Sequence, residues 1–170
     1  MSHSRIFEYS VSPIERDDCL TVDDFTEGDY LENVFRGKFS GDYVSETREE
    51  DRKEDLEWLM GALKGVSDNI VLQDNGTLLL KPGFKDDIRD FWYGKLHEAM
   101  DEINQVNVER YQNRFNLKFA LSDPLCMGFG FLFYNHEDMS LTASDVFFEF
   151  LLNMHDDAIV YIGSILDYHC

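Results

Sequence analysis

The chain has 170 residues, of which 44% are hydrophobic and 14% aromatic, so it can bury a core without a metal or disulfide staple. Its 34 acidic and 15 basic residues give a formal net charge of −19 and a pI near 4.4. That charge opposes direct binding to nucleic acid and to anionic membranes. It favours cationic partners, including proteins that themselves bind nucleic acid.

The length predicts a single domain over residues 1–170. The three cysteines, Cys19, Cys126 and Cys170, are far apart and lack metal-ligand spacing, which favours a reducing cytosol. No apolar run has the length of a membrane span, and residues 1–9 lack the apolar stretch of a signal peptide. We therefore expect a cytoplasmic protein that does not associate with membranes.

The first 44 residues combine a predicted strand with a strongly acidic segment. β-branched and aromatic residues predict a strand from Ile6 to Val11. Residues 15–32 hold eight acidic residues against one arginine, and their irregular apolar residues predict a loop that carries a short helix. Gly37 and Gly41, set among aromatic residues, predict strand fragments joined by a turn over residues 34–44.

A helix and a hairpin are predicted next. Thr47 and Glu50 match a capping box, and the helix after them ends before Gly65. Its apolar face is made of Leu56, Leu59, Met60 and Leu63. Asn75 and Gly76 lie between the apolar runs 70–72 and 77–80, which predicts a hairpin with a type I′ turn.

The longest helical period runs from Phe84 to Phe115 and predicts a helix whose apolar stripe is buried. A helix of about thirty residues would be about 45 Å long, so we expect a break near Asn104–Asn107. The helical period then continues to Ser122 and ends before Pro124. The stripe consists of Ile88, Phe91, Trp92, Leu96, Met100, Ile103, Val106 and Tyr111.

The remaining residues predict two internal strands with a helix between them. The apolar runs 127–134 and 158–166 are the predicted strands, and Thr142 with Asp145 three residues later predicts a capped helix. Strands and helices alternate irregularly along the chain. The pattern predicts an α+β fold, with a largely antiparallel sheet packed by about three to four helices including the long one near residues 84–115.

No motif in the sequence identifies a catalytic, cofactor-binding or metal-binding site, and we predict no cofactor. His97 and Asp101 have the i, i+4 spacing of two metal ligands, but without further ligands an ordinary helix-surface pair is the better interpretation. His136, Glu137 and Asp138 form the best candidate cation cluster. They support an alternative hypothesis, a metal-dependent enzyme that uses acidic residues, against the simpler interpretation of a solvated turn.

The remaining functional signal is the uneven distribution of charge. Residues 119–170 hold eight acidic residues and no lysine or arginine, and residues 15–32 are nearly as one-sided. Carboxylates four residues apart on a helix lie about 6 Å from each other, which is comparable to the spacing of successive phosphates. The predicted partner-binding residues are Asp17, Asp18, Asp23, Asp24, Glu27, Asp29, Glu32, Glu50, Glu54 and Glu57.

In size and charge the chain resembles, as a class, the small acidic anti-restriction, anti-CRISPR and nuclease-immunity proteins. The resemblance implies an inhibitor, not an enzyme. It would block a basic nucleic-acid-handling protein such as a nuclease by nucleic-acid mimicry or steric cover, with Tyr30 and Phe35 as aromatic anchors. A further alternative is an oligomeric scaffold or accessory subunit whose acidic residues only solvate its surface.

Overall fold

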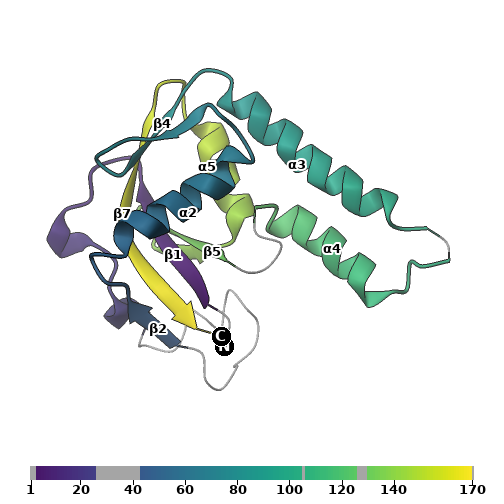
Figure 1. Ribbon diagram of the computed structural model, residues 1–170, viewed down its shortest axis with the longest axis horizontal. Coiled ribbons are helices and arrows are strands. Elements are labelled where there is room, and N and C mark those ends of the chain that lie inside the picture. The colour runs from purple at the N-terminus through teal and green to yellow at the C-terminus, as the bar shows by residue number, and fades with distance from the viewer. Residues whose placement is uncertain (1–2, 26–42, 105, 126–129, 170) are drawn as a thin grey trace.

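The computed structural model of the chain describes residues 3–25, 43–104, 106–125 and 130–169. One seven-stranded sheet organises these residues, with strand order β3-β4-β7-β1-β5-β6 and with β2 also paired to β7 (Figure 1). The strands are β1 (His3–Ser10), β2 (Tyr43–Glu46), β3 (Ile70–Leu72), β4 (Thr77–Leu80), β5 (Phe131–Asn135), β6 (Ser140–Thr142) and β7 (Ile159–His169).

The helices among the described residues are α2, α3, α4 and α5, together with two short 3-10 helices, η1 and η2. β1 and β5 run parallel, whereas the other strand pairs are antiparallel. The predicted α+β class with a largely antiparallel sheet is therefore confirmed. The bounds are η1 (Arg16–Asp18), η2 (Val22–Phe25), α2 (Arg52–Lys64), α3 (Phe84–Asp101), α4 (Tyr111–Ser122) and α5 (Ser144–Asn153).

β7 is the central strand. It pairs with β1 along one edge, and with β4 and then β2 along the other. A strand paired on both edges and covered on both faces is expected to be apolar throughout, so the internal strand predicted for residues 158–166 is confirmed. The other predicted internal strand is confirmed as β5 from Phe131 onward, while residues 126–129 lie outside the described part of the chain.

The two faces of the sheet carry two separate apolar clusters. Alternate residues of β1 enter different clusters, because successive side chains of a strand point to opposite faces. Phe7 and Tyr9 pack under α2, α3 and α5, whereas Ile6 packs against Leu20 on the other face. The larger cluster therefore lies under the helices, and the segment with η1 and η2 covers the smaller one.

α2 packs its predicted apolar face on the sheet, with Leu59 and Leu63 almost fully buried. The predicted capping box is wrong. The Thr47 hydroxyl donates to the Ile165 carbonyl at 2.6 Å, and Asp51 occupies the N-cap. Thr47 therefore contacts the central strand β7 and does not cap α2.

The β3–β4 hairpin forms where it was predicted, but its turn is of a different type. Gly76 has a φ of 80°, and Asn75 is not among the residues with positive φ, so a type I′ turn is ruled out. The Gly76 N–H donates to the Gln73 carbonyl, and the Gln73 N–H donates to the Thr77 carbonyl. This is a three-residue loop with a type I turn followed by a left-handed glycine.

α3 and α4 form a helical arm that extends away from the sheet (Figure 1). The expected break is confirmed, since α3 ends at Asp101 and α4 begins at Tyr111. The prediction of a fully buried stripe is wrong in its second half. Ile88 is buried, but Met100, Val106 and Tyr111 are 56%, 83% and 71% exposed. The end of the arm near α5 contributes Phe84 and Ile88 to the larger apolar cluster, while Ala99 is buried farther along α3.

α5 forms where a helix was predicted and buries Phe147 and Leu151, whereas the apolar periodicity also predicts burial of Val146, which is 36% exposed, and of Phe150, which is half-buried. Its predicted cap is wrong. Thr142 belongs to β6, and its hydroxyl donates to the Phe133 carbonyl. The first turn of α5 is instead held by the Ser144 hydroxyl, which donates to Asp123 at 2.6 Å. Every helix in the described ranges is too short or too polar to cross a membrane.

Candidate partner-binding surface

The surface is built around an irregularity between the two central strands. Phe7 pairs with Ile165 and Tyr9 pairs with Ile162, so the single residue Glu8 faces two residues of β7, at positions 163 and 164. This arrangement is a β-bulge, which leaves one N–H of the longer strand without a ladder partner. The Glu8 carboxylate accepts that bond from the Ser164 N–H at 2.7 Å.

Glu8 is fully buried and has three partners. One of its carboxylate oxygens accepts from the Leu20 N–H at 3.1 Å and lies 2.8 Å from His136 Nδ1, while the other binds the bulge. Buried carboxylates are stable only when their oxygens are satisfied in this way. Glu8 therefore fastens the segment with η1 to β7 and to the end of β5.

The bulge requires glycine at position 163. A Cβ built on Gly163 would overlap the Glu8 carboxylate and would lie 2.7 Å from Ile14 Cδ1. The absence of a side chain therefore allows the carboxylate to approach the backbone. A sequence signal for this existed, because Gly163 and Ser164 interrupt an apolar strand, but sequence reasoning missed both the bulge and Glu8.

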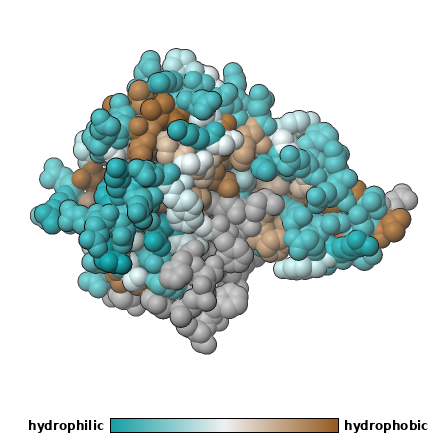
Figure 2. All heavy atoms as spheres, in the orientation of Figure 1, coloured by the Kyte–Doolittle hydropathy of each residue, from teal (hydrophilic) through white to brown (hydrophobic). Residues whose placement is uncertain are grey.

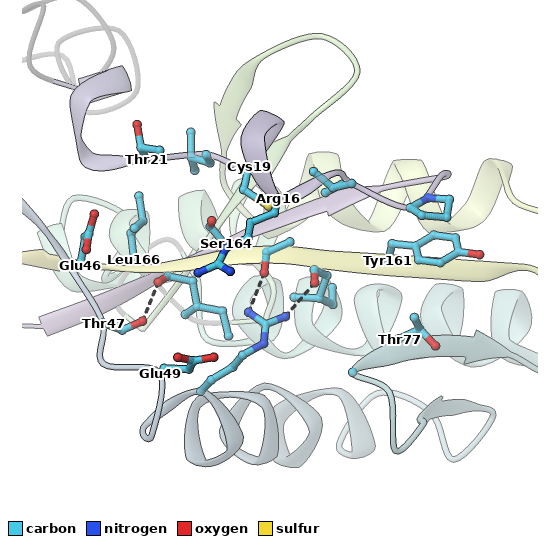
Figure 3. Close-up of a pocket in the computed structure, with 18 of the residues that line it drawn as sticks. Arg16, Cys19, Thr21, Glu46, Thr47, Glu49, Thr77, Tyr161, Ser164 and Leu166 are labelled. Carbon is cyan, nitrogen blue, oxygen red and sulfur yellow. Dashed lines mark hydrogen bonds between the residues drawn. The ribbon is translucent and has the colours of Figure 1, made fainter.

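A groove of about 630 Å³ runs beside the bulge (Figure 3). Figure 3 shows Cys19 and Thr21 on one side of β7 and Thr47 and Glu49 on the other. The groove thus lies between two chain segments that are distant in the sequence. Its polar and charged lining comprises Arg16, Cys19, Thr21, Glu46, Thr47, Glu49, Arg52, Asn75, Thr77, Tyr161 and Ser164.

Arg52 lines the groove and bonds to the backbone of β7. Its guanidinium donates to the carbonyls of Gly163 and Ile162 at 2.6 and 2.8 Å, which are carbonyls of the bulged strand. Burial lowers the pKa of Arg52, and the negative charge of Glu8 partly offsets that effect. Arg52 therefore acts as a fastener between the start of α2 and β7.

Acidic side chains stand on both sides of the groove. On one side, Arg16 and Cys19 line the groove, and Asp17 and Asp18, which lie between them in the sequence, are exposed beside it. On the other, Glu46 and Glu49 line the groove, and Glu54 follows on the exposed face of α2. The fold therefore brings exposed carboxylates of two segments that are distant in the sequence to the neighbourhood of one groove, which Arg16 and Arg52 also line.

Basic side chains on the α2 side neutralise part of this charge. Arg48 binds Glu50 at 3.0 Å, and Lys53 lies 3.7 Å from Glu57. Both pairs are exposed, and exposed pairs contribute little stability while leaving carboxylate oxygens accessible. No ion pair within the described part of the chain involves Glu54.

The predicted partner-binding residues are exposed wherever the structure describes them. Asp17, Asp18, Asp23 and Asp24 lie on η1 and η2, and Asp24 accepts hydrogen bonds from the N–H and hydroxyl of Thr21. Glu50, Glu54 and Glu57 lie on or next to α2. Five residues lie outside the described ranges, namely the predicted contacts Glu27, Asp29 and Glu32 and the predicted anchors Tyr30 and Phe35.

The candidate cation cluster does not converge on one point. His136 contacts Glu8, Glu137 accepts from Ser10, and Asp138 accepts from the Ser140 hydroxyl. Within residues 3–25, 43–104, 106–125 and 130–169, no three His, Cys, Asp or Glu side chains gather as a metal would require. His97 and Asp101 form the exposed pair expected of them, at 3.3 Å.

Cys19 is the one cysteine whose environment the structure describes. Burial raises the pKa of its thiol, and the negative charge of Glu8 raises that pKa further. A raised thiol pKa disfavours the thiolate, which is the reactive form. The environment of Cys19 is therefore that of an unreactive thiol.

Comparisons with protein-family models, with curated proteins and with solved structures gave no match to this chain. Interpretation of the surface accordingly depends on its own geometry and charge.

Proposed function

We propose that this protein binds a basic nucleic-acid-handling protein, such as a nuclease, and inhibits it by presenting carboxylates where that protein holds phosphates. The observation that supports the proposal most directly is that both segments bordering the groove carry exposed carboxylates, namely η1 and the residues before and within α2. Exposed negative charge of this kind attracts a cationic nucleic-acid channel.

The rigidity of both edges also supports this proposal. Glu8 fixes the η1 side to β7, and Arg52 and Thr47 fix the α2 side to the same strand. Carboxylates held on a rigid frame lose less conformational entropy on binding than those on a free chain. Preorganised charge of this kind favours fast, salt-sensitive association.

The test begins with capture from the native host. The immobilised protein is exposed to host lysate that has been treated to remove nucleic acid, at low and at high ionic strength. The proposal expects a basic nucleic-acid-handling protein to be retained only at low ionic strength, and its activity to fall when the protein is added. Retention that does not depend on salt, or a retained enzyme that stays fully active, would contradict it.

A charge-reversed variant then tests where the partner binds. The variant with Asp17→Lys, Asp18→Lys, Asp23→Lys and Asp24→Lys should associate with the partner at least about tenfold more slowly. The reason is that electrostatic steering of a cationic partner depends on negative charge near the binding surface. The matched control reverses Asp86, Asp90, Glu98 and Asp101, which are exposed on α3 and change the net charge equally. Equal effects of the two variants on the association rate would reject the η1 edge as the binding surface.

A further inference from the structure

Among the elements that the structure describes, α4 is the strongly basic one. Arg110 at its N-cap, Arg114 and Lys118 follow one another at four-residue steps, so they form a row along one side of the helix. Residues 110–122 contain no acidic side chain. All three bases are exposed, and no ion pair in the described part of the chain involves them.

Exposed apolar side chains accompany this basic row. Tyr111 lies beside it, and Val106 and Val108 continue the exposed apolar surface around the free end of the arm. Figure 2 shows hydrophobic surface at that end, away from the sheet. Exposed apolar groups gathered with arginine and tyrosine are the usual composition of an interface centre. The arm thus offers a cationic, partly apolar face that nothing in the described chain covers.

We propose that this arm face docks on the acidic face of α2 in a second copy of the chain. The acidic face consists of Glu50, which precedes the N-cap of α2, and of Glu54 and Glu57 on α2 itself, and all three are exposed. Arg48 and Lys53 contact Glu50 and Glu57, but both pairs are exposed and leave carboxylate oxygens accessible. The basic row spans about 12 Å at 1.5 Å per residue, and the two faces are opposite in sign.

Each copy carries a net charge of −19, so the proposed attraction between two copies is local. It acts between the basic row of one arm and the exposed carboxylates at the start of α2 in the other copy. Each copy also carries both faces, so the contact can form twice around a two-fold axis. Two arm contacts per dimer then close the assembly.

The dimer would use some of the same acidic residues as the proposed inhibitory surface, but it does not depend on that function. A cationic partner would compete with the arm of the second copy for Glu50, Glu54 and Glu57. The dimer contact is therefore tested on the purified chain, without any other partner.

Sedimentation of the full chain tests the proposal. The unaltered protein should be dimeric at about 0.05 M NaCl and dissociate at about 0.5 M, because screening weakens exposed charge contacts. The variant with Arg110→Glu, Arg114→Glu and Lys118→Glu should raise the dimer dissociation constant more than about tenfold. The variant with Glu50→Lys, Glu54→Lys and Glu57→Lys should do the same.

Mixing these two variants gives the sharpest readout. Each carries one reversed face and one unaltered face, so the mixture places opposite charges together again at a reversed arm and a reversed α2. A heterodimer in the mixture, with monomers in each variant alone, is the expected result. As the control, Lys64→Glu, Lys81→Glu and Arg89→Glu make the same charge change at exposed sites outside α4 and should leave the dimer intact.

Three results would overturn the proposal. These are a monomer at low salt, a dimer that the α4 variant does not weaken, and a mixture of the two variants that forms no heterodimer. Single-stranded DNA provides the remaining measurement. If the unaltered protein binds single-stranded DNA and the α4 variant does not, the basic row binds a polyanion and not a second copy.

Discussion

At the scale of single residues, the buried carboxylate of Glu8 connects three parts of the structure. It contacts Leu20 after η1, the bulged strand β7 and His136. We predict that Glu8→Ala lowers the free energy of unfolding by at least about 2 kcal/mol, because a buried donor left without an acceptor costs about 1–3 kcal/mol. Urea denaturation measures the change.

A conservative variant separates the lost hydrogen bonds from lost packing. Glu8→Gln keeps the shape and one acceptor oxygen, but its amide group cannot accept a bond from a backbone N–H. It should therefore lie between the unaltered protein and Glu8→Ala in stability. If all three unfolded at the same urea concentration, the fastening role of Glu8 would be wrong.

Glycine at position 163 provides a second residue-scale prediction. Gly163→Ala should destabilise the protein, because the added methyl group collides with Glu8 and Ile14. Gly61→Ala is the matched control, since a Cβ there meets nothing within 4 Å in the exposed middle of α2. Alanine in a helix is favoured over glycine by about 1 kcal/mol. Thermal unfolding should thus shift in opposite directions for the two variants.

The reactivity of the Cys19 thiol provides a separate test of the buried Glu8 carboxylate. Burial and, second, the charge of Glu8 raise the pKa of Cys19. Its alkylation by iodoacetamide should therefore begin to accelerate at a higher pH than the alkylation of a free thiol does. Glu8→Gln removes the second cause, so the alkylation profile should move to lower pH. Replacing Cys126 and Cys170 with serine isolates the signal. An unchanged profile in Glu8→Gln would show that this carboxylate does not act on the thiol.

At the scale of elements, sequence patterns predicted which segments form helices and strands better than they predicted how those segments end. The apolar faces of α2 and α5 and the β3–β4 hairpin follow from periodicity, because burial of an apolar face decides the type of element. The caps depend on single side chains. Thr47 donates to Ile165 of β7, and Ser144 donates to Asp123. Both partners lie far from the donor in the sequence.

The candidate surface was predictable only in part. The acidic composition of both edges follows from the sequence, whereas the groove between them depends on β7 pairing with β1 and β2. The Glu8 contacts join residues up to 156 positions apart. No local pattern predicts such a contact, although Gly163 within an apolar strand signals a close approach there.

The attachment of the arm yields an element-scale prediction. Trp92 of α3 donates its indole N–H to the Ala120 carbonyl of α4 at 3.0 Å. Trp92→Phe removes this bond and should lower the free energy of unfolding by about 1–3 kcal/mol, since the carbonyl loses its donor. Tyr93→Phe, at an exposed position on the same helix, is the control and should have no effect. Hydrogen exchange of the α4 amides should accelerate only in Trp92→Phe.

At the scale of the whole molecule, charge and packing act against each other. The apolar clusters on the two faces of the sheet favour folding. The 34 acidic side chains outnumber the 15 basic ones, so the excess negative charges repel one another. Such self-repulsion destabilises the compact state but supplies the long-range field that a cationic partner would experience. The same excess of charge therefore links stability to the proposed function.

This repulsion predicts that salt stabilises the folded protein. Raising NaCl from about 0.02 to about 0.3 M shortens the screening length to less than 10 Å, so the melting temperature should rise. The variant with lysine at positions 17, 18, 23 and 24 carries less net negative charge and should show a smaller rise. Repeating the scan on diluted protein and with KCl separates screening from self-association and from effects of a particular ion. A melting temperature that falls as salt is added would mean that attractive ion pairs, such as Arg5 with Asp55 and Asp167, outweigh the repulsion.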